Sequence, residues 1–312
     1  MIVIVGILII LPLSLAPGYV RKKRIAQQRL ENISSKVVNT THGKIEYVIS
    51  GEGYPIIVSH GITGGVDQGL GMADTYIGEG FQIIAVSRYG YLNTSLPDDP
   101  SPTRQADAYA ELLDKLDIKK AIVFGYSAGG PSAIQFAIQY PERCYALVLV
   151  SSTVPGDVSL PPKPIMRVVF GSDFVYYSIC TLFKNRMLSQ VGAPRKMLEQ
   201  LSKERKEEIY DNILLGGLPI SSRTPGVLND MYLSNPDINS GYEFERISVP
   251  TLMVHAIDDP LIPIAWAKAT AERIPNSLFV EIKEGGHLFL NHELEVKSTI
   301  KSFLKDRCSF SF

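Results

Sequence analysis

The sequence predicts an α/β fold with a doubly wound, mostly parallel sheet. Short, continuous apolar runs recur along the chain, and such runs are typical of strands that are buried on both faces of a parallel sheet. Helical patterns separate several of these runs. Repeated alternation of strand and helix places parallel strands in one sheet with helices on both of its faces. The 312 residues are enough for one large domain with an inserted segment.

The individual elements follow from periodicity and turn residues. Two β-rich stretches, residues 36–40 and 44–50, flank a turn at His42-Gly43 and predict a hairpin. Two helices are predicted from apolar residues at helical spacing, and the second ends before Pro141; they cover residues 103–116 and 128–140. The apolar runs predict further strands at residues 55–59, 82–87, 121–124, 145–152, 251–255 and 278–282.

The alternation stops between residues 154 and 247. This stretch opens with PGDVSLPPKP and then becomes helical and rich in Met, Phe and Tyr. We interpret it as an inserted helical cap whose aromatic side chains form its own core. The α/β core then comprises residues 34–153 and 248–307.

Residues 1–20 predict a hydrophobic membrane anchor. Residues 1–16 carry no charged side chain, and RKKR at residues 21–24 follows the apolar run. A signal peptide has its basic residues before the apolar run, so an uncleaved single helix is favoured, with a polar stalk at residues 25–34. The basic flank favours a cytoplasmic catalytic domain. Because a run of about 16 residues is short for a span, a buried N-terminal helix or an interfacial segment is the alternative.

Composition excludes some partners. The 31 Lys and Arg nearly balance the 32 Asp and Glu, which gives a net charge of -1 and no bulk attraction for nucleic acid. The three cysteines, Cys144, Cys180 and Cys308, are scattered without the spacing of a disulfide framework or a zinc site. No metal site is predicted.

The segment with the strongest chemical signal is Gly125-Tyr126-Ser127-Ala128-Gly129. It lies between a predicted strand and a predicted helix, where a sharp turn exposes the central serine hydroxyl and leaves little room for side chains beside it. The start of the helix also favours developing negative charge. The context therefore predicts Ser127 as a nucleophile, in the arrangement known as a nucleophile elbow.

A serine nucleophile needs a base and an orienting acid. Of the five histidines, His287 fits best, because it lies in the glycine-containing loop KEGGHLFL after the last predicted strand. The acid is expected between the serine and the histidine, at the end of a strand. Asp258 and Asp259 both follow the strand PTLMVHA, and either fits by position alone.

Three segments carry a resemblance to a known family: FGYSAGGPSAIQFAIQYPERCYALVLVSS, VPTLMVHAIDDPLIP and EGGHLFLNHELEV. They resemble the α/β-hydrolase superfamily, in its serine-nucleophile members with an inserted helical cap, over residues 37–304. The resemblance implies an α/β-hydrolase fold and favours Asp259 as the acid.

The resemblance also implies an oxyanion hole. Its donors would be the N–H groups of Ala128 and Ile62, the second in a loop that resembles the family's His-Gly loop. His60 is interpreted as holding that loop. Asp67 is interpreted as a surface-loop aspartate, with a place in the pocket lining as the alternative, and no catalytic role is assigned to Arg88.

The predicted function is a serine hydrolase that cleaves a carboxylic ester, a thioester or a related acyl bond through an acyl-enzyme. A C–C bond hydrolase, a perhydrolase or an acyltransferase would use the same three residues, and a non-catalytic binding module on this scaffold is the alternative from another class. The mechanism needs no metal and no cofactor. The expected partners are a small to medium hydrophobic acyl substrate and, through the N-terminal segment, a membrane; the oligomeric state is not predicted.

Overall fold

A single mixed sheet organises the chain. The computed structural model describes residues 2–308 and 310, with side chains described from residue 14 onward. Within these residues the sheet has eight strands in the order β1-β2-β4-β3-β5-β6-β7-β8. The strands are β1 (Lys36–Thr40), β2 (Gly43–Ser50), β3 (Tyr54–Ser59), β4 (Phe81–Val86), β5 (Ala121–Tyr126), β6 (Cys144–Val150), β7 (Thr251–Ala256) and β8 (Ser277–Ile282).

The predicted pattern of strands is confirmed. The hairpin β1-β2 is antiparallel and joins the sheet through β4. From β4 to β8 every neighbouring pair is parallel. Each predicted strand agrees with the observed one to within about two residues at either end, the usual uncertainty of element boundaries. The buried strands β5 and β7 have no exposed residue along their length, which explains their continuous apolar runs.

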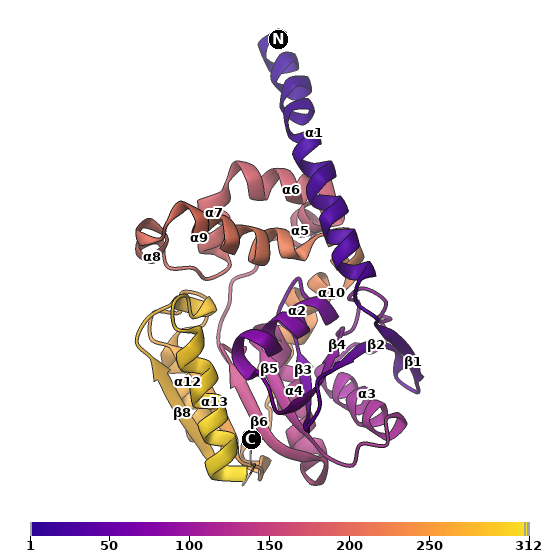
Figure 1. The fold of residues 1–312 in the computed structure, drawn as a ribbon, viewed down its shortest axis with the longest axis vertical. Helices are drawn as coiled ribbons and strands as arrows, with labels where there is room; N and C mark the ends of the chain where they lie inside the picture. Colours follow the sequence, from indigo (N-terminus) through magenta and orange to yellow (C-terminus); the bar gives the residue numbers. More distant parts are fainter. Residues whose placement is uncertain (1, 309, 311–312) are drawn as a thin grey trace.

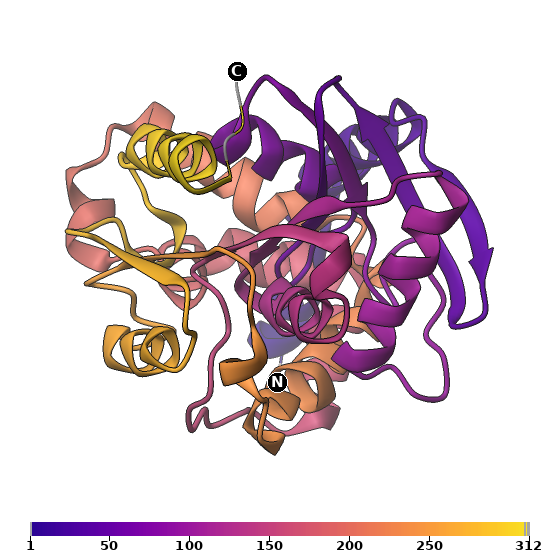
Figure 2. The same cartoon turned by 90° about the horizontal axis from the view of Figure 1, so that it is seen from below.

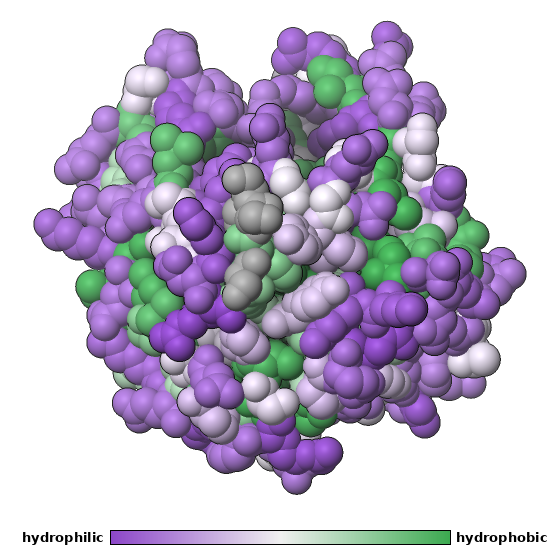
Figure 3. All heavy atoms as spheres, turned by 60° about the horizontal axis from the view of Figure 1, so that its bottom comes forward, coloured by the Kyte–Doolittle hydropathy of each residue, from purple (hydrophilic) through white to green (hydrophobic). Residues whose placement is uncertain are grey.

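Helices cover both faces of the sheet (Figure 2). On one face lie α3 (Pro102–Lys115), α4 (Gly130–Gln139) and α12 (Ile264–Glu272), and on the other lie α2 (Val66–Met72) and α13 (Glu293–Cys308). Each face has its own buried apolar cluster, so the doubly wound α/β fold is confirmed. At the end of the molecule opposite the cap, hydrophilic side chains predominate and apolar ones form small separate patches (Figure 3).

The segment between β6 and β7 is helical, and we call residues 154–247 the cap. Its helices α5 to α9 lie above the sheet in Figure 1. A third apolar cluster contains most of its buried aromatic side chains, including Tyr176, Tyr177 and Tyr210. The exact domain boundaries stay a prediction. The cap helices are α5 (Lys163–Gly171), α6 (Asp173–Leu182), α7 (Lys184–Gln190), α8 (Arg195–Gln200), α9 (Lys203–Ile209), α10 (Thr224–Asn229) and α11 (Asn235–Asp237).

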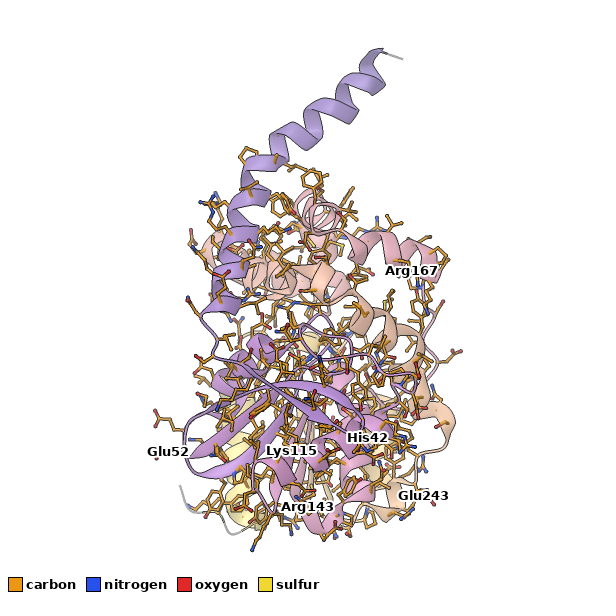
Figure 4. All side chains as sticks on the ribbon, turned by 90° about the vertical axis from the view of Figure 1, so that its right-hand side faces the viewer. His42, Glu52, Lys115, Arg143, Arg167 and Glu243 are labelled. Carbon is orange, nitrogen blue, oxygen red and sulfur yellow. The ribbon has the colours of Figure 1, made fainter. Side chains whose placement is uncertain are left out.

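The N-terminal segment is one continuous helix, α1 (Ile2–Glu31). Its first half projects away from the other elements, and its second half lies beside the cap (Figures 1 and 4). The predicted stalk, residues 25–34, is not free, because Ala26 is buried and Arg29 Nη2 lies 2.9 Å from Asp67 Oδ2. The preceding turns of α1 also contact the cap. Tyr19 packs edge-on against Phe174 with ring centroids 5.2 Å apart, and Lys22 lies 2.6 Å from the carboxylate of Asp211.

The predicted membrane anchor is not confirmed. It falls on residues 1–20, of which Met1 and the side chains before residue 14 lie outside the described part. Among the described residues, no single helix is both long enough and apolar enough to span a membrane. Only α5 and α6 taken together meet the two criteria, and these two helices are sharply bent relative to each other.

The packing of α4 against the sheet predicts a large loss of stability on truncation. Phe136 is fully buried, so Phe136→Ala should lower the free energy of unfolding by about 3–5 kcal/mol through lost burial and a residual cavity. The matched control is Leu294→Ala, because Leu294 is 81% exposed and should change stability by less than about 0.5 kcal/mol. Denaturant unfolding measures both, and similar values for the two variants would contradict this packing.

Candidate active site

The predicted site residues meet at one edge of the sheet. Ser127 follows β5, Ile62 lies in the loop after β3, Asp259 follows β7, and His287 follows β8. Because these strands are parallel, their carboxyl ends lie at the same edge, where ligands bind in open α/β sheets. Residues far apart in the sequence are therefore close in space for a topological reason.

Ser127 lies in a strained turn. Its φ is 48°, in the left-handed region that a non-glycine residue rarely adopts. A short 3-10 turn, Ser127–Gly129, then leads directly into α4. A Cβ on Gly129 would come within 2.1 Å of the carbonyl oxygen of Ser59, and one on Gly125 within 2.8 Å of the Ala133 Cβ. The two glycines are therefore required by close packing, as the motif predicts.

Hydrogen bonds connect Ser127, His287 and Asp259 in series. The Ser127 Oγ is 2.8 Å from His287 Nε2, and His287 Nδ1 is 2.8 Å from Asp259 Oδ2. A carboxylate only accepts, so Nδ1 carries the proton and the Nε2 lone pair faces the serine hydroxyl. His287 and Asp259 are 4% and 7% exposed, whereas Ser127 is half-buried.

The structure separates the two adjacent aspartates. Asp258 accepts hydrogen bonds from the N–H groups of Gly285 and Gly286 and thereby fixes the loop that carries His287. Asp259 instead contacts the imidazole, and its Oδ1 accepts the N–H of Leu261 at 2.8 Å. Of the two aspartates that fit by sequence position, Asp259 is the one that contacts the His287 imidazole.

The surroundings keep Asp259 ionised. Burial alone would raise its pKa, but the electrostatic interaction with His287 and the hydrogen bonds from His287 Nδ1 and the Leu261 N–H lower it overall. His255 lies 3.4 Å from the same Oδ2 and donates from Nε2 to the Ile262 carbonyl at 2.8 Å. Burial lowers the pKa of His255, which favours the neutral form beside the carboxylate.

The predicted oxyanion loop lies against the serine turn. A Cβ built on Gly61 would be 3.4 Å from the Ser127 Cβ, so this loop reaches the nucleophile position. The Ile62 N–H donates to no other described residue, while the Gly61 N–H is held by the Gln68 side chain at 2.9 Å. The Ile62 N–H therefore has no partner among the described residues, in the loop that contacts the turn of Ser127, and Ala128 lies in the helical turn that follows the serine.

Two buried Arg–Asp pairs hold this loop, and we call them the crossed pairs. Arg88, after β4, pairs with Asp230 of the cap, and Arg223 of the cap pairs with Asp67 of α2. Each arginine also bonds the loop itself. Arg88 Nε donates to the His60 carbonyl at 2.8 Å, and Arg223 Nη1 donates to the Gly64 carbonyl at 2.5 Å. The pairs thus join cap, core and oxyanion loop.

Sequence reasoning missed most of this support. The interpretation of Asp67 as a surface residue is wrong, since its side chain is 5% exposed. Burial alone would raise the pKa of Asp67, but the charges of Arg223 and Arg29 lower it overall. The partners of Arg88 and Arg223 are 142 and 156 residues away in the chain, and no local pattern indicates such pairs.

His60 lies under the loop, as expected. It is fully buried; its Nε2 accepts the Arg88 N–H at 3.0 Å, and its Nδ1 lies 2.6 Å from the Gly61 carbonyl. Burial, together with the charge of Arg88, holds the pKa of His60 well below its usual range. A neutral His60 that spans two backbone segments has a structural role.

The cap also contacts the loop of His287 directly. The His287 N–H donates to the carbonyl of Gly192, between α7 and α8, at 3.0 Å. A Cβ on Gly192 would lie 2.2 Å from the His287 Cβ, so the contact is very close. The backbone position of His287 therefore depends on a cap residue.

Metal binding has no structural support in the described part. Among residues 2–308 and 310, no group of three or more His, Cys, Asp or Glu side chains is placed to hold an ion. That the reaction needs no metal and no cofactor stays a prediction from the chemistry of the three residues.

Comparison with known proteins places the chain in a family. Residues 54–291 match the family described as alpha/beta hydrolase fold. An uncharacterized hydrolase, YcgS of Bacillus subtilis, is 29% identical over 84% of this chain and 95% of its own length. A poly(3-hydroxyalkanoate) depolymerase of Ectopseudomonas oleovorans is 32% identical over 72% of this chain and 75% of its own length.

A solved structure agrees. An alpha/beta hydrolase fold protein from Nakamurella multipartita superposes with a TM-score of 0.70 at 29% identity, over 89% of this chain and 100% of that chain. The chain belongs to the alpha/beta hydrolase family and is a hydrolase.

The lowered pKa of Asp67 predicts acid sensitivity. A carboxyl group whose pKa is lower in the folded than in the unfolded chain stabilises the fold above its unfolded value, about 4, and this contribution is lost as the pH falls through the folded pKa. At pH 7, Asp67→Asn should lower the free energy of unfolding by about 3–5 kcal/mol, because Arg223 stays buried without its counter-charge.

The difference from the unmutated chain should shrink as the pH falls through the lowered pKa of Asp67, because Asp67 itself then becomes protonated. Denaturant unfolding across this pH range tests it, with Asp98→Asn as control because Asp98 is exposed. A difference that does not change with pH would contradict the assignment.

Proposed function

We propose that this hydrolase cleaves a carboxylic ester, a thioester or a related acyl bond with Ser127 as nucleophile, His287 as general base and Asp259 as the orienting acid. The observation that carries the proposal is the continuous series of hydrogen bonds, 2.8 Å from serine to imidazole and 2.8 Å from imidazole to carboxylate. A serine hydroxyl in such a series is activated by the imidazole.

The reaction follows from these contacts. The Ser127 Oγ attacks the substrate carbonyl carbon while His287 Nε2 takes its proton, and Asp259 stabilises the imidazolium. The N–H groups of Ile62 and Ala128 donate hydrogen bonds to the carbonyl oxygen and stabilise the negative charge that develops on it. His287 then returns the proton to the leaving alcohol or thiol. Water, deprotonated by His287, next attacks the acyl carbon, and His287 gives that proton to the Ser127 Oγ as the acid leaves.

The surroundings favour a hydrophobic acyl group. Leu288 and Leu290, next to His287, belong to the apolar cluster of the cap, and the Ile62 side chain packs against the same cluster. An acyl chain that approaches Ser127 from the cap side would contact apolar side chains. We therefore propose a small to medium hydrophobic acyl substrate.

Other reactions on the same residues remain outside this proposal. A C–C bond hydrolase, a perhydrolase or an acyltransferase would differ in what leaves or attacks, and no single contact favours one of them. A non-catalytic binding role is disfavoured by the intact hydrogen-bond series. A membrane anchor at residues 1–20 and a cytoplasmic catalytic domain stay predictions from the sequence.

Loss of the hydroxyl tests the nucleophile. Ser127→Ala should abolish labelling by a fluorescent fluorophosphonate and reduce kcat on a short acyl ester by about 10³-fold or more, since only binding and the oxyanion donors remain. Ser298→Ala, in an exposed position of α13, should label and turn over like the unmutated chain. Labelling that persists in Ser127→Ala would place the reactive group elsewhere.

The adjacent aspartates form a matched pair for the acid. Asp259→Asn should lower kcat by about 10³–10⁴-fold, because an amide no longer fixes the imidazole tautomer or stabilises its charge. Asp258→Asn keeps one side-chain oxygen that can accept a hydrogen bond from the N–H groups of the His287 loop, so it should lower kcat by about tenfold or less. Steady-state kinetics compares the two, and the reverse order would assign the acid to Asp258.

A further inference from the structure

The N-terminal helix contributes a side chain to the support of the oxyanion loop. Arg29 lies in the last turn of α1. Its Nη2 lies 2.9 Å from Asp67 Oδ2 and donates to the cap carbonyls of Gly216 at 2.7 Å and Leu218 at 3.0 Å. Arg29 therefore meets α2 and the cap at one point. It also lies outside the matched family region, residues 54–291.

Asp67 connects Arg29 to the loop. Its Oδ2 faces both Arg29 and Arg223 Nη2, the latter at 2.7 Å. Arg223 in turn holds the Gly64 carbonyl. Gln68, the residue after Asp67, holds the Gly61 N–H. Ile62 lies between Gly61 and Gly64, which these two side chains hold. A displacement of Asp67 would therefore move the supports of the loop on both sides of Ile62.

We propose that Arg29 is a positioning residue of the active site, which sets the Ile62 N–H through Asp67; this rests on the hydrolytic function proposed above. Arg29 touches neither substrate nor Ser127. It anchors Asp67 against the cap, and a displacement of about 1 Å in a group that stabilises the transition state is enough to cost up to about 100-fold in rate. The effect should fall on kcat, because an oxyanion donor acts mainly on the transition state.

The same helix provides matched controls. Lys22 pairs with Asp211, and Lys23 lies 2.9 Å from Asp173; both aspartates belong to the cap. These lysines hold α1 against the cap without contact to the oxyanion loop or its supports. A comparison of Arg29 with Lys22 therefore separates the docking of α1 from the specific contact with Asp67.

The kinetic test uses the full chain and a short acyl ester. Arg29→Met should lower kcat about tenfold or more with KM changed by less than about twofold. Arg29→Lys keeps a charge near Asp67 and should recover to within about threefold of the unmutated kcat. Lys22→Met should leave both constants within about twofold. Equal losses in Arg29→Met and Lys22→Met, or a loss confined to KM, would overturn the proposal.

A second readout does not depend on turnover. Hydrogen exchange of the backbone amides in residues 60–72 should be faster in Arg29→Met than in the unmutated chain and unchanged in Lys22→Met. Unchanged exchange in Arg29→Met would overturn the positioning role. If the unmutated chain neither turns over esters nor labels at Ser127, the proposed function fails, and the exchange experiment still decides whether Arg29 holds this loop.

Discussion

The sharp turn at Ser127 is the constraint on which the rest of the site depends. A left-handed φ at a serine is sustained only where surrounding contacts fix it. Here the turn is closed by the approach of Gly129 to the end of β3 and by a 3.0 Å bond from the Thr153 N–H to the Ser127 carbonyl. The same approach brings the loop after β3 to the serine, so the turn of Ser127 and the loop of Ile62 share one packing contact.

Buried charge then fixes how the cap and the core meet. In the crossed pairs, each side contributes one arginine and one aspartate. Separating the two sides would break both buried pairs, which is far more costly than breaking exposed ion pairs. The part of the cap that carries Arg223 and Asp230 is thus fixed to the core. The same arginines fix the carbonyls of His60 and Gly64 in the oxyanion loop.

Local chemistry explains what could be predicted. The strands, the turn at Ser127 and the loop of His287 follow from apolar runs and glycines within a few residues. The choice between Asp258 and Asp259 could not be made from position, since their side chains point to different partners, the loop amides and the imidazole. No local pattern indicates the pairing of Arg223 and Asp230, because their partners lie 156 and 142 residues away in the chain. The sequence does not indicate the packing of α1, because residues 21–24 are typical of the basic flank of an anchor and residues 25–34, which include Arg29, of a polar stalk.

The hydrogen bond from the His287 N–H to the Gly192 carbonyl makes the orientation of His287 depend on the position of a turn in the cap. If the turn between α7 and α8 swings away to admit substrate, the histidine backbone loses that bond, and the imidazole is less firmly aimed at the serine. Proton transfer is then fastest only after the turn has returned. On the mechanism proposed above, the enzyme would thus be least reactive while its site is most open to water.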